Sequence, residues 1–392
     1  MQRPAAPCRR PLVVAQLSTH AVMTTPTFDV LIVGGGPAGL STWLHLHELA
    51  PALASRALVI EKATYPRDKV CGGGVTAQAD LILNCLGVRT EVPSVAVHTI
   101  EFRLGAQSYY LRRRNILRVV RRREFDHALA KAAVARGLCL HDGEGLVDFQ
   151  RTADGVDVQT TRGRYRARTL VGADGVYSAV RRSMGLAEAA CRARLLETTT
   201  PIVTADDAQF TTHTAVFDFT PVTQGLQGYV WDFPCLNVGS RAMSRGIFDS
   251  QVYPDRPRSN LRAVFSRALE QRNVPVDLLA WAGHPVRWFS NTGVFAQPNV
   301  LLVGDAAGVD PSLGEGISLA LEYGELAADT LRDAFERNNF TFGDYRSRLL
   351  QHPLGRSLRM RSRLARNMYQ GGALAIEGMR QLFAADVSLT TS

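Results

Sequence analysis

The chain has 392 residues, of which 46% are hydrophobic and 21% are charged, and its formal net charge is +9. A chain of this length and apolar content can bury a large core, so we expect one large domain or two closely joined ones. The sequence contains no run of about 18 apolar residues, which argues against a membrane-spanning helix.

Arginine carries most of the positive charge, because lysine occurs only at Lys62, Lys69 and Lys131. Neither arginine cluster, 112–114 or 121–123, is interleaved with aromatic side chains that stack on bases, so we expect no nucleic-acid partner. The six cysteines form no CxxC pair, and no histidine stands at metal-ligand spacing from one of them. This cysteine usage predicts a reduced, cytoplasmic protein without a metal site.

The first elements are expected soon after residue 24. Residues 1–24 have no long apolar centre, so we predict a disordered leader rather than a secretory signal. A strand over 28–33, a glycine-rich turn, a helix over 37–49 and a second strand over 57–60 then follow. Both strands are apolar throughout, which is typical of a parallel sheet covered on both faces.

The middle of the chain alternates short strands with two helices. Strands are expected at 155–160, 169–172, 214–219 and 227–233, and helices at 123–136 and 260–271. The change to a strand-rich pattern between about residues 192 and 287 predicts an inserted sheet-based region. The apolar strand at 300–303 then returns the chain to the first sheet, and the remainder from 312 is expected to be helical.

The glycine-rich turn has the sequence Gly-Gly-Gly-Pro-Ala-Gly and lies between a predicted strand and a predicted helix. In a dinucleotide-binding fingerprint, Gly34 allows the tight turn, Gly36 lets a pyrophosphate approach the backbone, and Gly39 allows close packing of helix on strand. The free N–H groups of the helix N-terminus suit phosphates. Glu61, about 20 residues further on, can accept hydrogen bonds from ribose hydroxyls.

Two further motifs place an aspartate directly after an apolar strand. Gly-Ala-Asp-Gly, which contains Asp174, follows the strand at 169–172. Gly-Asp, at Gly304 and Asp305, follows the strand at 300–303, and a glycine-rich segment lies beyond it. Aspartates at strand ends can bind sugar-alcohol hydroxyls, and glycines at a helix start expose N–H groups to a polar ring edge.

This ordered set of three motifs resembles the flavoprotein hydroxylase and geranylgeranyl reductase superfamily, over about residues 28–334. The resemblance implies a p-hydroxybenzoate hydroxylase-like fold with FAD. It implies that Glu61 binds the adenosine ribose, that Asp305 binds the ribityl chain, and that Gly314 and Gly316 lie at the flavin pyrimidine edge. Arg123 looks like the arginine near the FAD phosphates. The other expected FAD contacts are Gly34, Gly36, Ala38, Gly39, Lys62, Gly73, Asp174, Gly304 and Ile317.

With this resemblance, the predicted fold class is α/β (α+β): a Rossmann-like FAD-binding domain with an inserted β-sheet substrate domain and a helical C-terminus. The expected divisions are a leader over 1–24, an FAD-binding domain with part of the substrate sheet over 25–190, the substrate or cap sheet over 191–290, a return to the FAD-binding domain over 291–337, and C-terminal helices over 338–392.

Two segments are similar to signatures of the reductases within this superfamily. The first, Lys-Val-Cys-Gly-Gly, places Lys69 beside Cys71, and the resemblance implies that it crosses near the flavin ring. A thiol beside a lysine can donate a proton or orient a substrate, so both residues are candidate catalytic groups.

The second segment, Tyr-Val-Trp-Asp-Phe-Pro, supplies the candidate substrate contacts Tyr229, Trp231, Phe233 and Pro234. Strand alternation sends the three aromatic side chains to one face, which suits an apolar chain. The stretch after them, 237–246, departs from the glycine-rich pattern of the reductases and leaves the substrate open.

The main functional hypothesis is a reductase. Reduced FAD would deliver a hydride to an isoprenoid or polarised double bond, and Cys71 or solvent would supply the proton. Only one dinucleotide fingerprint is evident, so NAD(P)H or another reductant is expected to bind transiently.

Two alternatives stay open. An FAD-dependent monooxygenase or halogenase would act on an aromatic or polyketide-like substrate, although Tyr229 and Phe233 replace the Trp and Ile of the halogenase pattern. A non-enzymatic FAD-binding or lipid-carrier protein is disfavoured by the intact flavin-facing elements.

The partners expected from the sequence are a small, apolar substrate and, through the basic stretch 356–366, peripheral contact with a membrane. The same stretch also fits a solvated helix face. The sequence does not indicate an oligomeric state.

Overall fold

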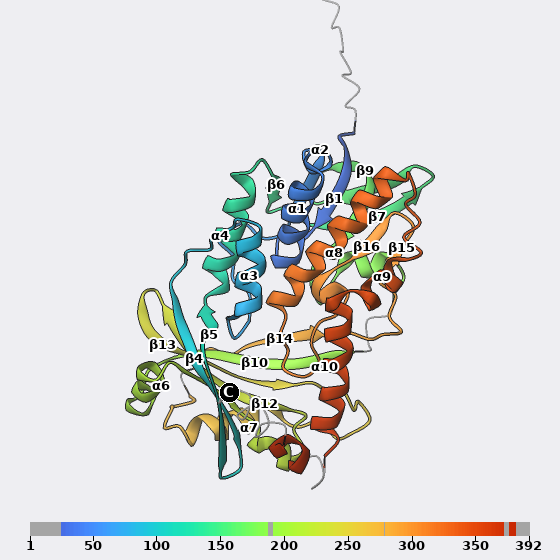
Figure 1. Cartoon of the computed structure of the whole chain (residues 1–392). Coiled ribbons are helices and arrows are strands. Elements are labelled where there is room, and N and C mark those ends of the chain that lie inside the picture. The colour runs from blue at the N-terminus through green and yellow to red at the C-terminus, as the bar shows by residue number, and fades with distance from the viewer. Residues whose placement is uncertain (1–24, 187–190, 278, 372–375, 382–392) are drawn as a thin grey trace, which may run out of the picture.

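The computed structural model describes residues 25–186, 191–277, 279–371 and 376–381. Two sheets of eight strands each organise these residues, and they lie one above the other in Figure 1. The two sheets, the helices on the first one and the helical C-terminal part confirm the predicted α/β fold class. The domain boundaries stay a prediction, and the leader at 1–24 lies outside the described residues.

The first sheet, in the upper half of Figure 1, contains the strands predicted around the glycine-rich turn. They are β1 (Thr27–Val33), β2 (Ala57–Glu61), β6 (Cys139–Asp142), β7 (Leu146–Thr152), β8 (Gly155–Thr160), β9 (Arg164–Gly172), β15 (Ala296–Gln297) and β16 (Val300–Leu302). Strands β16, β9, β1, β2 and β6 are neighbours in that order and run parallel. Their carboxyl ends therefore meet along one edge of the sheet, where nucleotides bind in such folds.

Helices cover this sheet. They are α1 (Pro37–Leu49), α2 (Pro51–Ala54), α4 (Arg122–Val134), α5 (Ala179–Ser183) and α8 (Ile317–Glu336). Helix α3 (Ala77–Cys85) instead packs against α8 and against strands of the second sheet. Helices α1 and α8 pack so closely that a Cβ at Gly324 would lie 2.4 Å from Oγ of Ser41. The Ser41 hydroxyl donates to the carbonyl of Leu321 at 2.8 Å, which satisfies a polar group inside this contact.

The second sheet contains β3 (Gly74–Thr76), β4 (Ser94–Leu104), β5 (Gln107–Val120), β10 (Arg192–Pro201), β11 (Thr214–Asp218), β12 (Gly228–Asn237), β13 (Ser240–Asp249) and β14 (Ala282–Arg287). Its order is β14-β10-β13-β12-β11-β4-β5-β3. The long hairpin of β4 and β5 was not among the predicted elements, because residues 112–115 in the middle of β5 are exposed and lack an apolar pattern.

Helix α7 (Leu261–Glu270) packs on one face of the second sheet, where Phe265 and Leu269 bury Val230 and Ile247. The short elements of this region are α6 (Asp207–Thr211), η1 (Thr204–Asp206) and η2 (Thr220–Gln224). The opposite face of the sheet joins the main core of the molecule.

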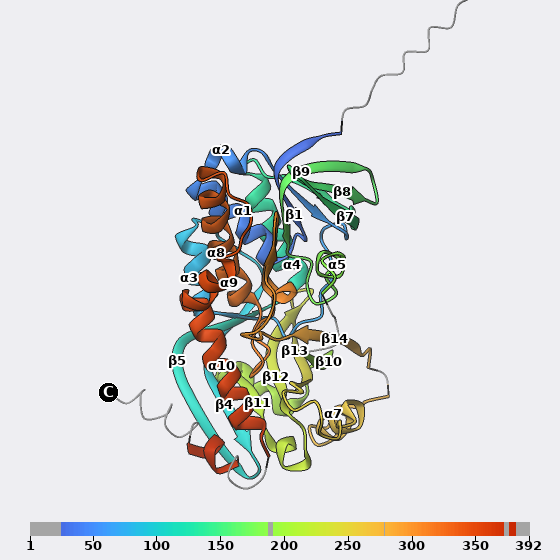
Figure 2. The ribbon, with the colours of Figure 1, turned by 90° about the vertical axis from the view of Figure 1, so that its right-hand side faces the viewer.

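The C-terminal part contains α9 (Tyr345–Gln351), α10 (Pro353–Tyr369) and a short helical segment at 376–381. Figures 1 and 2 show α10 running from the level of the first sheet down to that of the second. The Arg361 side chain of α10 binds Asp310 at 2.8 Å and Glu315 at 2.6 Å, so this helix holds the loop that follows β16. None of the described helices is both long enough and apolar enough to cross a membrane.

Candidate functional site

The turn after β1 has a backbone that only glycine accommodates. Gly34 has a φ of +109°, and a Cβ there would lie 2.3 Å from the carbonyl oxygen of Ala173. A Cβ at Gly39 would lie 1.9 Å from the Gly34 oxygen. These close approaches place the turn directly against the segment that follows β9.

Glu61, the last residue of β2, points back at this turn. Its carboxylate accepts hydrogen bonds from the backbone N–H groups of Gly35 at 2.9 Å and Ala63 at 3.0 Å. The residue is only 6% exposed, so the two donors compensate much of the cost of burying the charge. Each carboxylate oxygen can accept a further bond from a hydroxyl group.

Arg67 lies above the start of α1 and was not identified from the sequence. Its guanidinium is 3.4 Å from Glu61 and 3.1 Å from Asp126 of α4, and a Cβ at Gly36 would lie 3.5 Å from its Nη2. The guanidinium therefore sits over the glycine that a pyrophosphate is expected to approach. A single arginine in an arginine-rich chain gives no sequence signal for this role.

The aspartates of the other two motifs lie at the same edge of the sheet. Asp174 accepts from the backbone N–H groups of Ala179 and Val180, while its buried Oδ1 has no hydrogen-bond partner among the described residues. Burial raises the pKa of Asp174. Asp305 lies within the short helix η3 (Gly304–Ala306), which follows β16.

Close glycine contacts hold the loop after β16 in place. Gly304 has a φ of +58°, and a Cβ there would lie 2.7 Å from the Cβ of Ala38 in α1. A Cβ at Gly316 would lie 3.6 Å from the Asp305 carboxylate. The loops after β1, β9 and β16 thus converge at one edge of the first sheet, as the three motifs predict.

The segment from Lys69 to Gly73 crosses from the first sheet to the second. Gly73 has a φ of +81°, and a Cβ there would lie 2.1 Å from the Val120 oxygen. A Cβ at Gly72 would lie 3.3 Å from both Trp231 and Phe233. This segment therefore lies against the aromatic side chains of β12.

Those aromatic side chains share one face of β12. The Tyr229 and Trp231 ring centroids are 6.3 Å apart, and those of Trp231 and Phe233 are also 6.3 Å apart. All three belong to the core that faces the first sheet, whereas Val230 packs under α7. Strand alternation places Pro234 on the other face, away from the three rings.

Comparison with known proteins identifies the family. Residues 27–329 match the family described as FAD binding domain. The chain is 30% identical over 344 residues to the menaquinone reductase of Mycobacterium tuberculosis, across 77% of this chain and 76% of the relative. It is 28% identical over 347 residues to digeranylgeranylglycerophospholipid reductase 2 of Methanopyrus kandleri, across 80% of this chain and 78% of the relative.

The chain belongs to the FAD binding domain family.

Solved structures show the same fold. A geranylgeranyl bacteriochlorophyll reductase-like protein from Thermoplasma acidophilum matches with a TM-score of 0.76 at 20% identity, across 93% of this chain and 92% of that one. A probable FAD-dependent monooxygenase from Pseudomonas aeruginosa matches with a TM-score of 0.67 at 18% identity, across 92% of this chain and 100% of that one. The chain is thus an FAD-dependent oxidoreductase, and the resemblance to the geranylgeranyl reductase group is confirmed.

The nucleotide edge of this flavoprotein fits FAD. The turn packs closely at Gly34 and Gly39, the Arg67 guanidinium lies beside Gly36, and the buried Asp174 Oδ1 has no hydrogen-bond partner among the described residues. Glu61 and Asp305 are the acceptors suited to ribose and ribityl hydroxyls. When bound, FAD supplies the two-electron chemistry, whereas the protein supplies orientation and electrostatics.

Among the predicted FAD contacts, the structure does not bring every residue to this edge. Lys62 is exposed and packs beside Gly145. Arg123 is half exposed and binds Asp68 at 3.0 Å. The preceding residue, Arg122, is instead buried against Asp126 and interacts with Cys71. Helix α4 begins at Arg122 and not at Arg123, so the Arg122 side chain points inward and the Arg123 side chain points outward.

The remaining predicted contacts lie on the loop that leads into α8. Gly314 has a φ of +69°, and a Cβ there would lie 2.8 Å from the Phe248 ring. Gly316 precedes Ile317, the buried first residue of α8. This loop is fixed from both sides, because Arg361 binds its Glu315 and the Tyr229 hydroxyl donates to the Leu313 carbonyl at 2.6 Å.

The two candidate catalytic residues have different surroundings. The Lys69 ammonium lies 2.7 Å from His284 Nε2 of β14, and burial lowers the pKa of Lys69. Burial and the neighbouring Lys69 charge lower the pKa of His284 to about 4. Cys71 Sγ accepts from the Gly73 N–H at 3.4 Å. Sequence spacing gave no signal for His284, because it comes from a strand far along the chain.

Proposed function

We propose that this oxidoreductase reduces carbon–carbon double bonds of an isoprenoid or similarly apolar substrate. The observation that carries the proposal is the contact between the Lys69–Gly73 segment and the aromatic face of β12. A Cβ at Gly72 would lie 3.3 Å from the Phe233 ring and 3.3 Å from the Trp231 Nε1, so backbone and aromatic rings meet without an intervening side chain. Such an apolar wall suits a hydrocarbon chain rather than a charged metabolite.

The relatives support the same substrate class. Two of them are named for the reduction of menaquinone and of a digeranylgeranyl glycerophospholipid. We infer that the substrate chain lies along Tyr229, Trp231 and Phe233. In this proposal Glu61, Arg67, Asp174 and Asp305 hold FAD, and NAD(P)H or another diffusible reductant supplies its electrons. Arg122 takes the role first assigned to Arg123.

An oxygen-transfer function is the alternative, favoured by the fold shared with a probable monooxygenase. In the deciding experiment, the FAD-loaded protein is reduced with dithionite under anaerobic conditions. The reduced protein is then mixed rapidly with geranylgeraniol in detergent micelles or with O₂.

For a reductase, flavin absorbance returns on mixing with geranylgeraniol, and mass spectrometry shows a gain of two hydrogens. A flavin–oxygen adduct that persists in air, together with an unchanged geranylgeraniol, would contradict the proposal.

We also propose a cytoplasmic location with peripheral membrane contact through α10. The described part of this helix exposes Met360, 61% accessible, between exposed Arg356 and Arg363. An apolar side chain flanked by arginines suits the surface of an anionic bilayer. Sedimentation with vesicles of phosphatidylglycerol, compared with phosphatidylcholine, tests this contact. Equal sedimentation with both lipids would argue against it.

A further inference from the structure

A glutamate on the second sheet faces the candidate site and was not among the predicted residues. Glu197 of β10 is paired in register with Gly246 of β13, and Gly246 is paired with Trp231 of β12. Residues directly opposite one another on neighbouring strands share a face of the sheet. Glu197 therefore lies on the same face as the aromatic side chains, two strands away from Trp231.

No side chain separates Glu197 from Trp231. A Cβ at Gly246 would lie 2.1 Å from the indole ring, so the Trp231 ring extends across β13 toward β10. The neighbouring Thr199, two residues along β10, binds Arg121 through its hydroxyl at 2.8 Å. The Glu197 carboxyl group therefore lies between the aromatic side chains of β12 and the polar contact of Thr199 with Arg121.

The two oxygens of this carboxyl group have different environments. The backbone N–H of Cys71 interacts with the group, which ties it to the Lys69–Gly73 segment. Its Oε2 is buried and has no hydrogen-bond partner among the described residues. A buried carboxyl oxygen without a donor is costly when charged, so the neutral acid is favoured at this position.

The charged groups around Glu197 offset only part of the effect of burial on its pKa. Burial raises the pKa of Glu197, whereas the Cys71 N–H and nearby cations lower it. Glu197 interacts electrostatically with five residues. They are Lys69 and Cys71 of the segment before β3, Arg121 and Arg122 at the start of α4, and Cys235 of β12.

Cys71 is less suited to give a proton. Its sulfur accepts from the Gly73 N–H and interacts with the Arg122 guanidinium. Both neighbours are hydrogen-bond donors, so the sulfur acts toward them as an acceptor. Burial of Glu197, by contrast, raises the pKa of its carboxyl group and so favours the protonated form.

We propose that Glu197 is the acid that protonates the substrate during double-bond reduction, in place of Cys71. The inference rests on the proposed function. One alkene carbon receives a hydride from the reduced flavin, which is thereby oxidised by two electrons. The other carbon receives the proton of the Glu197 carboxyl O–H, the π bond breaks, and two C–H bonds form. The carboxylate then regains a proton from water.

The test uses the full FAD-loaded chain, reduced with dithionite under anaerobic conditions and mixed with geranylgeraniol in micelles. Glu197→Gln keeps the shape of the side chain but removes the acid, and we expect it to slow flavin reoxidation about 100-fold or more. FAD affinity should remain that of the wild type. Cys71→Ser should retain most of the rate. Glu101→Gln is the matched control, because Glu101 is a buried glutamate of the same sheet that is already paired with Arg103.

Infrared difference spectroscopy of the apoprotein provides a readout independent of turnover. Burial also raises the pKa of Asp174, and it raises that of Glu322 to about 7. We therefore expect a component of the protonated-carboxyl band near neutral pH that is lost in Glu197→Gln and retained in Glu101→Gln. A wild-type rate in Glu197→Gln, or a protonated-carboxyl band in Glu197→Gln equal to that of the wild type, overturns the role of Glu197 while the proposed function stands. A wild-type protein that leaves geranylgeraniol unchanged overturns the proposed function itself.

Discussion

Lys69, on the segment that leads from the first sheet to the second, lies 2.7 Å from His284 of β14, measured between Nζ and Nε2. The imidazole Nδ1 lies 2.5 Å from the carbonyl oxygen of Pro285, which fixes Nδ1 as the protonated nitrogen of a neutral ring. Nε2 is then free to accept from the ammonium. The charge of Asp305 acts on both groups, so the pair lies within electrostatic reach of the expected ribityl site.

Replacing Lys69 with methionine should raise the pKa of His284 from about 4 toward its ordinary value of 6.5, because the ammonium no longer repels the imidazolium. Burial should keep the pKa somewhat below 6.5. NMR titration of the histidine ring protons measures the change. Lys131→Met, on the distant end of α4, serves as the control and should leave His284 unaffected.

The same shift affects stability. Because the folded pKa of His284 lies below the unfolded value of 6.5, the unfolded chain binds more protons between about pH 4 and 6.5. The free energy of unfolding should therefore rise with pH across this window, and the contribution of His284 should be constant above it. Lys69→Met should flatten the rise. An unchanged pH dependence of urea unfolding would show that the two groups are not coupled.

Gly39→Ala should strongly weaken FAD binding. The new methyl group would lie 1.9 Å from the Gly34 oxygen, so α1 would have to move away from the turn that receives the cofactor. We expect a loss in affinity of about 100-fold or more, equivalent to about 3 kcal/mol. Flavin fluorescence titration gives the affinity, and circular dichroism checks that the variant folds.

Gly163→Ala is the control for this substitution, because a Cβ at Gly163 meets no atom within 4 Å. It should bind FAD as the wild type does. If both variants bind FAD equally well, close packing of the turn is not what forms the cofactor site.

Local sequence patterns were sufficient for the elements around the cofactor. The helix expected over 37–49 is α1, because a glycine-rich turn and a proline mark its start, and the strand expected over 155–160 is β8, because its residues alternate between buried and exposed. Alternation likewise placed Tyr229, Trp231 and Phe233 on one face of β12.

The sequence did not predict the residues of distant strands that complete the site. His284 meets Lys69 only because β14 pairs with β10 at the edge of the second sheet. Glu197 faces Trp231 only because the residue between them, on β13, is Gly246, which has no side chain. The choice between Arg122 and Arg123 depended on the exact start of α4, and one residue of shift rotates a helical side chain by about 100°.

Arg67→Met should weaken FAD binding, because this guanidinium lies over Gly36 and neutralises the neighbouring Glu61 and Asp126. A charge-assisted hydrogen bond contributes about 1.5–3 kcal/mol, so the dissociation constant should rise about 10- to 100-fold. Fluorescence titration of the apoprotein measures it. Arg123→Met should change it by less than about twofold, since Arg123 forms an exposed pair with Asp68. The reverse order of effects would restore the original assignment of Arg123.

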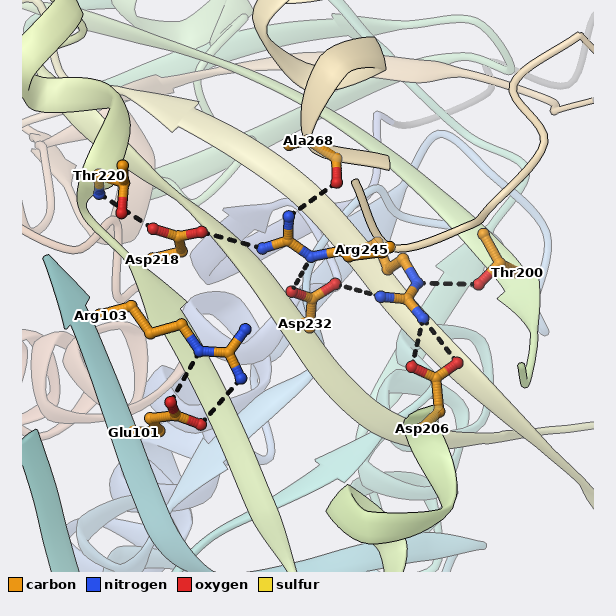
Figure 3. A network of polar contacts seen from close by, with 10 residues as sticks. Glu101, Arg103, Thr200, Asp206, Asp218, Thr220, Asp232, Arg245 and Ala268 are labelled. Carbon is orange, nitrogen blue, oxygen red and sulfur yellow. Dashed lines mark hydrogen bonds and ion pairs between the residues drawn. The ribbon is translucent and has the colours of Figure 1, made fainter. Parts of the chain in front are cut away.

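Asp232 lies on the α7 side of β12, behind the aromatic face, and binds two arginines at once (Figure 3). Its carboxylate accepts from Arg245 of β13 and, at 2.6 Å, from Arg272, while Arg245 also binds Asp206 at 2.6 Å. Asp232 and Arg245 are each about 1% exposed. Asp232→Asn should destabilise the protein by about 1.5–3 kcal/mol, because Arg245 and Arg272 lose a shared buried carboxylate and keep only Asp206 and Asp218 as counterions.

Urea unfolding measures this loss, and Asp207→Asn provides the matched control. Asp207 faces Arg241 at 3.7 Å, and both side chains are 59% exposed, so its removal should cost about 0–1 kcal/mol. The network in Figure 3 fixes the back of β12 and thereby the direction of Trp231 on its front. Asp232→Asn should therefore also alter tryptophan emission in the folded state. Equal unfolding midpoints for the two variants would contradict this account of how the substrate face is held.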